Sequence, residues 1–295
     1  MTLGRFLQYI VSGVHVGSIY ALTALCFTLI FNATHVINFS QGQMVMLGGM
    51  SAAALYGVGL PLWGAVLLAV VIVVAVSVVF ERIAIRPLLQ AGVLAQIVAT
   101  VGASFVFQTV AMLIWGRDER SLPSFPGGGA VLHFAGATVT GQTLWIAGLT
   151  LVIVVGLQLF YRKSLFGTAV RACAVDPLGA RLQGISYRVV VVFSFALAGA
   201  ISATAGAVFT PATMMNYSSG TMLGLNGFVA ATLGGLGSPA GAVLGGYALG
   251  IVEALATGFI PGGSGYKDAI SFVVLLLVLF ARPSGFLGPK AVERQ

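Results

Sequence analysis

The sequence contains very little charge. Only 7% of its 295 residues are Asp, Glu, Lys or Arg, whereas soluble globular domains carry about 25%. Hydrophobic residues make up 58% of the chain and its mean hydropathy is +1.04, a composition that excludes an ordinary soluble domain. The 40 glycines agree with this, because glycine lets helices pack closely in lipid. The sequence therefore predicts a protein that crosses a membrane several times.

Sequence motifs for catalysis and metal binding are also lacking. GxxxxGK[ST], HExxH and GxSxG do not occur, and His15, His35 and His133 have no neighbouring acidic or cysteine residue. Cys26 and Cys173 lie far apart and form no CxxC pattern, so we interpret both as small, unreactive hydrophobic residues. Basic residues occur singly between apolar stretches, unlike those of a nucleic-acid-binding protein. We expect a transport protein that is not an enzyme and holds no metal or cofactor.

Carboxylates are almost absent from the apolar stretches, where Glu253 is essentially the single acidic residue. A carrier driven by an ion gradient usually displays several intramembrane carboxylates or a cationic relay. This scarcity favours a permease whose driving force comes from a separate protein. Glu253 itself could contact the transported solute, or it could be protonated, or it could pair with His15 or Lys267.

The apolar stretches predict an all-α, polytopic membrane helix bundle that forms a single domain over residues 1–295. A helix needs roughly 20 apolar residues to cross about 30 Å of hydrocarbon. The clear candidates are Phe6–Phe31, Leu62–Phe80, Val93–Trp115, Thr143–Tyr161, Val189–Phe209 and Ala240–Ile260. Three weaker candidates are short or rich in polar residues and glycine, as broken or partly inserted helices are: Val36–Tyr56, Leu225–Leu236 and Asp268–Ala281.

The distribution of Lys and Arg predicts the orientation, because cytoplasmic loops carry an excess of both. Segment 162–188 has several basic residues and a single acidic one, so we expect it in the cytoplasm together with Glu81–Gly92 and the tail after Ala281. Gly116–Gln142, with balanced charge, is expected outside. These assignments give nine spans, with the N-terminus outside and the C-terminus cytoplasmic. The alternative makes Val36–Tyr56 re-entrant, which gives eight spans and an inside N-terminus.

The cytoplasmic segment 162–188 is expected to contain one short helix. Asp176 can cap it and Pro177 can occupy its first position, and Gly184 is expected near its end. About seven residues span roughly 10 Å, which is too short to cross a bilayer. Leu178 and Leu182 share a face with Ile185, so this helix could transmit a push from a cytosolic partner to the spans. The alternative is an ordinary loop whose arginines only fix the topology.

Polar residues interrupt two of the weaker candidates. In Val36–Tyr56, the polar residues Asn38, Ser40, Gln41 and Gln43 could line a polar constriction in the transport pathway. Alternatively, Asn38 and Ser40 could simply cap a helix end. In the second, we expect Asn226 and Gly227 to begin the interrupted element; short, glycine-broken segments often mark a transport pathway. The candidate pathway residues are Asn38, Ser40, Gln41, Gln43, Asn226, Gly227 and Glu253.

Three stretches resemble the branched-chain amino acid ABC transporter permeases, most of all the H-type subunit of leucine/isoleucine/valine uptake systems: Gly17–Gly49, Arg171–Ile185 and Gly224–Ala254. The resemblance implies a bacterial inner-membrane location and a homologous M-type permease. It also implies two cytosolic subunits that bind ATP and Mg, and a periplasmic solute-binding protein. By this resemblance, the residues that couple the permease to the ATPase are Arg171, Ala174, Asp176, Pro177, Leu178, Arg181, Leu182, Gly184 and Ile185.

The resemblance thus implies a permease that translocates branched-chain amino acids inward. One departure is Gln41–Gly42, where relatives often carry His–Gly, so the solute could instead be urea, an amide or an aromatic acid. A stand-alone facilitator for a small neutral solute is the alternative from another functional class. A facilitator would explain the scarcity of charge but would assign no function to the short cytoplasmic helix.

Overall fold

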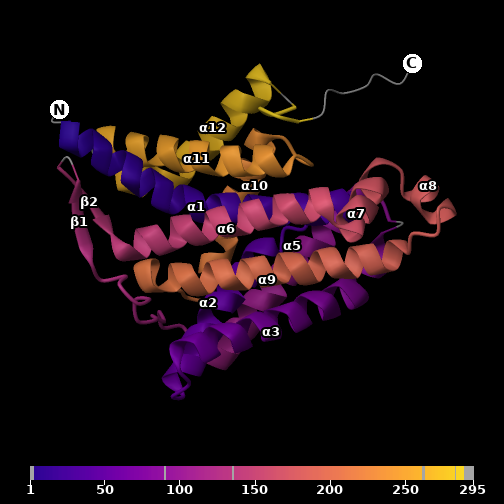
Figure 1. The fold of residues 1–295 in the computed structure, drawn as a ribbon, viewed down its shortest axis with the longest axis horizontal. Coiled ribbons are helices and arrows are strands. Elements are labelled where there is room, and N and C mark those ends of the chain that lie inside the picture. Colours follow the sequence, from indigo (N-terminus) through magenta and orange to yellow (C-terminus); the bar gives the residue numbers. More distant parts are fainter. Residues whose placement is uncertain (1–2, 90, 135, 261–262, 283, 289–295) are drawn as a thin grey trace. The chain divides into compact units, whose positions relative to one another are not determined.

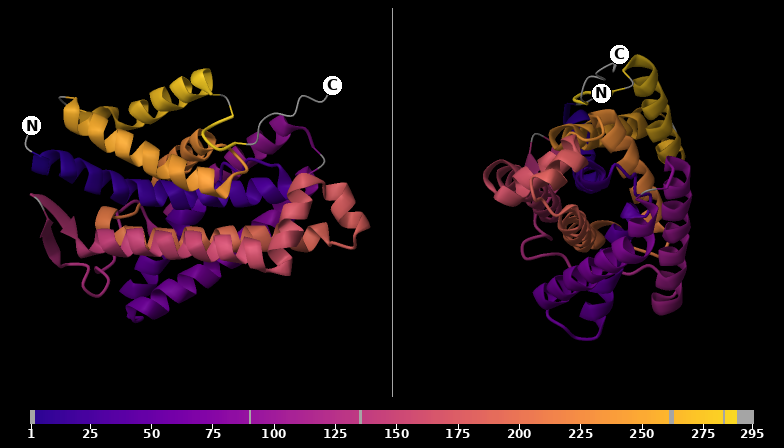
Figure 2. Two further views of the ribbon diagram at one scale, coloured as in Figure 1. Left: turned by 45° about the horizontal axis from the view of Figure 1, so that its top comes forward. Right: turned by 90° about the vertical axis from the view of Figure 1, so that its right-hand side faces the viewer.

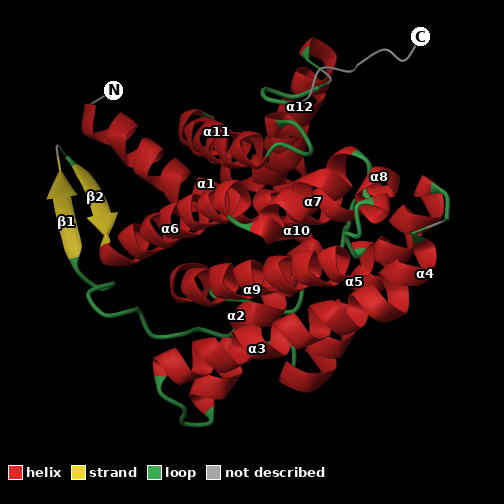
Figure 3. Cartoon of the chain, turned by 45° about the vertical axis from the view of Figure 1, so that its right-hand side comes forward, coloured by secondary structure: helices red, strands yellow, loops and turns green. Residues whose placement is uncertain are grey.

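The computed structural model describes the chain except for residues 1–2, 90, 135, 261–262, 283 and 289–295, so Lys290 and Arg294 of the predicted cytoplasmic tail lie outside the described residues. Helices dominate the fold (Figure 3). The chain divides into two compact units. Unit 1 comprises Met1–Thr28, Ser124–Thr150 and Leu225–Gln295, and unit 2 comprises Leu29–Pro123 and Leu151–Gly224.

Six helices in the described part of the chain are long and apolar enough to cross a membrane. This confirms the predicted polytopic helix bundle. Two of the helices, Leu62–Phe80 and Val93–Trp115, begin and end at the predicted residues. The six are α1 (Leu3–Thr34), α3 (Leu62–Phe80, continued by the π-helix Glu81–Ile85 and by α4, Arg86–Leu88), α5 (Val93–Trp115), α6 (Gly141–Lys163), α9 (Tyr187–Thr213) and α11 (Pro239–Phe259).

The three weaker candidates are also helices, but they are shorter. They are α2 (Gln41–Gly57), α10 (Ser219–Gly234) and α12 (Lys267–Ala281), with 17, 16 and 15 residues. At 1.5 Å per residue each is shorter than about 26 Å, which is less than the hydrocarbon thickness of about 30 Å. The count of nine spans therefore stays a prediction.

Helix α10 begins six residues before the predicted element. Ser219 is its first residue, and the side chain of Asn216 accepts hydrogen bonds from the backbone N–H groups of Ser218 (3.0 Å) and Ser219 (3.1 Å). This local cap starts the helix inside a polar stretch that the sequence analysis took for a break. The prediction that Asn226 and Gly227 begin an interrupted element is therefore wrong, because both lie in the middle of α10.

Unit 1 contains a β-hairpin that the all-α prediction did not include (Figure 2). Strands β1 (Val131–Phe134) and β2 (Ala137–Thr140) pair antiparallel within the segment expected to be an outside loop. Gly136 has a φ of +82° in the turn, a conformation that glycine adopts without steric cost. The strands have four residues each, too few for a clear alternating pattern in the sequence.

The core of unit 2 is formed by α2, which packs against α9 and α3 (Figure 1). Residues Gln41–Ala53 of α2 are all buried. A Cβ atom on Gly206 of α9 would overlap the carbonyl oxygen of Val45, and one on Gly48 would overlap the backbone of Ala203. Small residues therefore let α2 and α9 approach at backbone contact distance, as helices in membranes commonly do.

Unit 1 uses the same packing between α11 and the first part of α1. A Cβ atom on Gly250 of α11 would overlap the backbone of Gly17, and one on Gly246 would overlap Ala21. Gly246 and Gly250 on α11 are four residues apart, as are Gly17 and Ala21 on α1, so each pair lies on one face of its helix. Glycines in these helices thus allow the close helix–helix contacts that the high glycine content predicted.

Candidate functional site

Two short helices connect α6 to α9 in unit 2, and the predicted coupling residues lie in them or directly beside α8. They are α7 (Leu165–Val175) and α8 (Pro177–Leu182). The Asp176 carboxylate accepts a hydrogen bond of 2.9 Å from the backbone N–H of Leu178, and Gly184 follows the helix with a φ of +80°. The predicted cap, first residue and end of the short helix are confirmed.

Helix α7 was not predicted as a separate element. Its N-cap is Ser164, whose hydroxyl oxygen accepts a hydrogen bond of 2.8 Å from the backbone N–H of Gly167. A serine directly before an apolar run is a helix-start signal, and it could have revealed α7 in the sequence. A Cβ atom on Gly167 would lie 2.6 Å from Phe160 O and from Tyr161 Cα, so α7 packs tightly against the end of α6.

The two short helices are fixed to unit 2 by a small apolar cluster. Cys173 of α7 and Ala180 of α8 are buried together with Val190, near the start of α9, and with Ala33. The Arg181 guanidinium lies over the Tyr187 ring, 4.8 Å from its centroid, which adds a cation–π contact. Burial raises the pKa of the Cys173 thiol, while Arg181 opposes this shift. Helix α8 is therefore packed directly against the start of α9.

The outer face of this segment is apolar and exposed. Val175, Leu178 and Leu182 have relative exposures of 88%, 70% and 82%. Ile185, expected on the same face, is instead partly buried against the apolar cluster because it follows the end of α8. Of the other predicted coupling residues, Arg171 is exposed and Ala174 is half-buried. Large exposed aliphatic side chains are typical of surfaces that bind another protein.

The polar residues before and in α2 form a buried hydrogen-bonded group. The Asn38 side-chain oxygen accepts bonds from the Ser40 backbone N–H (3.1 Å) and hydroxyl (2.7 Å). Ser40 is the N-cap residue of α2, but its side chain makes no capping bond. The Gln41 amide donates to the Ser202 hydroxyl of α9 at 2.7 Å. Asn38 thus shapes the start of the helix, whereas Gln41 joins two helices.

Gln43 is the member of this group whose hydrogen bonding is incomplete. Its Nε2 donates to the hydroxyls of Ser104 in α5 (2.9 Å) and Thr221 (3.2 Å). Its Oε1 is buried and makes no hydrogen bond with any described residue. The sequence analysis missed Ser104, Thr221 and Ser202. Ser104 and Ser202 are hydroxyl residues within the long apolar helices α5 and α9, which was an available signal, whereas Thr221 lies in the polar start of α10.

Asn226 and Gly227 join α10 to α1 within unit 1. The Asn226 amide donates a hydrogen bond of 3.0 Å to the Tyr20 hydroxyl, and a Cβ atom on Gly227 would overlap the Thr23 side chain. Asn226 is 4% exposed. These contacts give both residues a role in helix packing.

Glu253 of α11 pairs with Lys267 at the start of α12. Lys267 Nζ lies 3.0 Å from Glu253 Oε1, and the contact is ionic rather than a well-aligned hydrogen bond. The Ser271 hydroxyl donates to Glu253 Oε2 at 3.5 Å. The Glu253 side chain is 1% exposed and that of Lys267 is 44% exposed. Of the two basic partners that the sequence offered, the structure thus selects Lys267.

Comparison with known proteins decides the family. The family model for the permease component of branched-chain amino acid transport systems matches residues 9–279. The chain belongs to this family of membrane permeases. The permease is 36% identical to the high-affinity branched-chain amino acid transport system permease protein LivH of Escherichia coli over 98% of this chain and 97% of that one. It is 32% identical to the permease protein BraD of Pseudomonas aeruginosa over 98% of both chains.

A solved structure shows the same overall fold as the permease. It is described as PsaBC from Streptococcus pneumoniae in complex with Fab, and the similarity has a TM-score of 0.51 over 97% of this chain and 93% of that one. Since only 10% of residues are identical, this similarity concerns the fold alone. Together with the apolar helices, membership of the family makes the permease a multi-pass membrane transport protein.

Proposed function

We propose that the permease is the H-type subunit of an ABC importer and translocates branched-chain amino acids inward. The observation that carries this proposal is similarity over nearly the whole chain to two permeases named for branched-chain amino acids. In this importer two cytosolic subunits bind ATP and Mg and hydrolyse ATP, a homologous M-type permease completes the pathway, and a periplasmic protein delivers the solute. This chain contributes no catalytic residue.

Helix α8 is proposed to couple ATP hydrolysis to transport. Leu178 and Leu182 would insert into a groove on an ATP-binding subunit, in the way that helices with exposed apolar anchors dock in grooves. Two observations support this role: both leucines are largely exposed, and the adjacent Ala180 is buried in the cluster that contains Val190 of α9. The helix is therefore exposed on one side and firmly attached on the other.

The proposed topology has nine spans in one permease domain, with the N-terminus outside and the C-terminus in the cytoplasm. It places 162–188, including α7 and α8, on the cytoplasmic side, where an ATP-binding subunit can reach them. The five basic residues of this segment support that orientation. A re-entrant α2, which would leave eight spans, is the alternative to be tested by accessibility labelling of the N-terminus.

Gln43 is proposed to contact the solute in the pathway. Its buried and unpaired Oε1 can accept a hydrogen bond from the solute ammonium group, while Ser104 and Thr221 hold the amide in place. Asn38, Ser40 and Gln41 would position the backbone that carries it. The pairing of Glu253 with Lys267 favours a structural role over direct solute contact.

The coupling role is tested with Leu182→Glu, using Gln183→Glu as the matched control. The control places the same charge one residue further along, on an exposed side chain outside the leucine face. We expect Leu182→Glu to abolish co-purification of the ATP-binding subunits and ATP-driven leucine uptake into vesicles, and Gln183→Glu to retain both. Unchanged assembly and uptake in Leu182→Glu would refute the coupling role.

The importer class and its solute are tested in liposomes. Uptake of leucine, isoleucine and valine should require ATP and the partner subunits. Specific flux through the purified chain alone would instead identify a stand-alone facilitator. ATP-driven uptake of urea, amides or aromatic acids, with no branched-chain amino acid transported, would contradict the proposed solute.

A further inference from the structure

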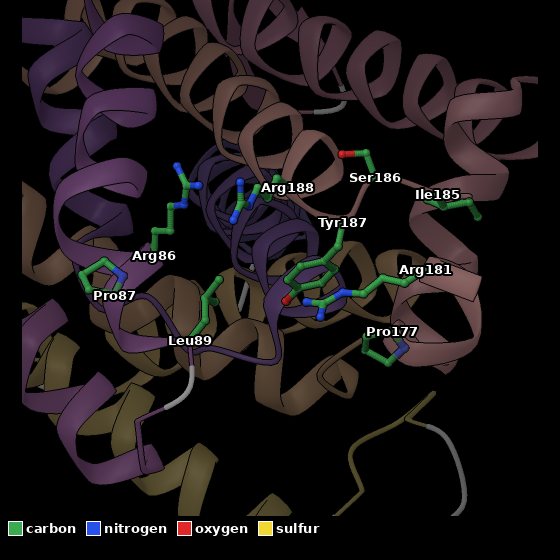
Figure 4. A pocket seen from close by; sticks show the side chains of 9 residues that line it. All are labelled: Arg86, Pro87, Leu89, Pro177, Arg181, Ile185, Ser186, Tyr187 and Arg188. Atoms are coloured by element: carbon green, nitrogen blue, oxygen red, sulfur yellow. The ribbon is translucent and has the colours of Figure 1, made fainter. Parts of the chain in front are cut away.

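A basic cavity of about 660 Å³ opens in unit 2, where α3 with its extension and α9 reach one end of the helix bundle. Arg86, Arg181 and Arg188 line it together with Ser186 and Tyr187. In Figure 4 the guanidinium groups of Arg86 and Arg188 extend into the same space, and Arg181 lies along the Tyr187 ring. None of the described lining residues of this cavity is acidic.

A second cavity, of about 550 Å³, shares Arg86 and Arg188 with the first and is largely apolar. Its apolar lining comes mainly from Val189, Phe193 and Ala196 of α9. These residues are three or four positions apart, so they form one stripe along the helix. From Arg188 to Ala196 the stripe is about 12 Å long. The basic cavity thus continues as an apolar groove that runs along a membrane-spanning helix.

The π-helical turn Glu81–Ile85 helps to place the arginines beside the groove. It extends α3 beyond Phe80 and carries Arg82, which lines the second cavity, while Arg86 follows at its end and lines both. Glu81 is 2% exposed, and Arg86 and Arg82 both act on its carboxyl group electrostatically. This single buried acid leaves a clear excess of positive charge around the two cavities.

We propose that these two cavities form a binding site for an anionic phospholipid. Its phosphate would lie against Arg86, Arg188 and Arg181, and one acyl chain would occupy the groove along α9. Guanidinium groups bind phosphate oxygens with two parallel hydrogen bonds. Basic pockets between membrane helices are suited to anionic headgroups. The site lies where α3 with its extension ends and α9 begins, the depth at which lipid headgroups occur.

The shape and lining of the site favour a lipid over other anionic partners. A free phosphate would use the arginines and leave the apolar groove empty. A docked protein would be expected to use the largely exposed Leu178 and Leu182, which do not line either cavity. Only a molecule with an anionic head joined to an apolar chain fits both cavities at once. Such a lipid would touch α8 and both spans, and so would restrain the proposed coupling helix.

The site is tested by native mass spectrometry of the full chain in detergent, titrated separately with phosphatidylglycerol, phosphatidylcholine and glycerol 3-phosphate. We expect phosphatidylglycerol to bind at least tenfold more tightly than either of the others. A basic residue near a membrane surface contributes about fivefold to anionic lipid binding. The double variant Arg86→Gln/Arg188→Gln should therefore bind phosphatidylglycerol about 25-fold more weakly. The double variant Arg162→Gln/Lys163→Gln removes the same number of positive charges from exposed residues outside both cavities, so it serves as the matched control and should bind normally.

The groove is tested separately with Ala196→Trp, which fills it without changing any charge. This variant should weaken phosphatidylglycerol binding while its elution profile in size-exclusion chromatography stays unchanged, which shows that it folds. Equal binding of glycerol 3-phosphate and phosphatidylglycerol would overturn the proposal in favour of a soluble anion. Equal losses in the Arg86→Gln/Arg188→Gln and Arg162→Gln/Lys163→Gln variants would overturn it as well, because binding would then depend only on overall charge.

Discussion

The ion pair between Glu253 and Lys267 makes a quantitative prediction about stability. The Glu253 side chain is 1% exposed, whereas that of Lys267 is 44% exposed and remains in contact with solvent. Removing the lysine leaves a buried carboxylate without its counter-charge, which costs about 3–5 kcal/mol. Removing the carboxylate leaves an ammonium group that water can still solvate, so we expect a cost of only about 1 kcal/mol.

These costs translate into different midpoints of thermal unfolding (Tm) in detergent. For chains of 150–250 residues, 1 kcal/mol shifts Tm by about 2–4 °C. Lys267→Met should therefore lower Tm by at least about 6 °C, and Glu253→Gln by about 2–4 °C. Glu253→Gln retains a group that can accept the hydrogen bond of Ser271, which limits its effect. The double variant should be close to Glu253→Gln alone, since no buried charge is then left unpaired.

Lys163→Met is the matched control for this series, because it makes the same substitution at an exposed lysine near the end of α6. Its Tm should change by no more than about 2 °C. The reasoning is refuted if Lys267→Met behaves like Lys163→Met. It is also refuted if the two single effects add in the double variant, since residues that interact directly do not behave independently.

Three further predictions concern unit 2. Asp176→Ala removes the N-cap of α8, which lowers the stability of this helix by about 1 kcal/mol. In hydrogen-exchange measurements the backbone amides of α8 should therefore exchange about fivefold faster, whereas Asp176→Asn should retain their protection. Gly206→Ala should lower Tm by at least about 2 °C, because the added Cβ would overlap the Val45 carbonyl oxygen. Gly102→Ala is the control and should leave Tm unchanged, because its Cβ would meet no neighbouring atom within 4 Å. In a Cys26→Ala variant, maleimide labelling of buried Cys173 should be slow at pH 7.5. It should rise with pH about a midpoint above the ordinary cysteine pKa of about 8.5, because burial raises the pKa of this thiol.

The sequence was most informative where a single physical signal dominates. Helices α3 and α5 have the predicted bounds because each is an apolar run with a clear local signal at both ends: Pro61 precedes α3 and the charged Glu81 follows it, and glycines flank α5. The short helix α8 was predictable because Asp176 and Pro177 are strong start signals and act locally. Neither case depends on contacts with distant parts of the chain.

Two kinds of feature were not predictable: contacts between distant parts of the chain, and a helix start that lies inside a polar stretch. The start of α10 depends on the Asn216 side chain, which pairs with nearby backbone groups in a stretch that is polar enough to be a loop. The partner of Gln41 is Ser202, 161 residues away, and no spacing rule connects them. The same holds for the two hydroxyls that bind Gln43. The candidate pathway residues were therefore found by their polarity, whereas their partners required the fold.

Helix α9 links the predicted coupling helix to the polar residues of α2 within unit 2. Val190, near its start, is buried with Ala180 of α8, and Ser202, about 18 Å further along, accepts the bond from Gln41. A continuous helix resists stretching, so a push on α8 should displace Ser202 and Gln41 together. Ser202→Ala removes this bond at a cost of about 1 kcal/mol.

We therefore expect Ser202→Ala to leave assembly with the ATP-binding subunits intact but to lower the amount of solute transported per ATP hydrolysed. Ser194→Ala is the matched control, because Ser194 is also a buried serine of α9 but donates its hydrogen bond to the Val190 carbonyl of the same helix. Equal transport ratios in the two variants, measured in proteoliposomes, would show that the bond between α9 and α2 does not carry the movement. A selective loss in Ser202→Ala would instead assign the transmission to this one hydrogen bond, because the two variants differ only in whether a contact between helices is removed.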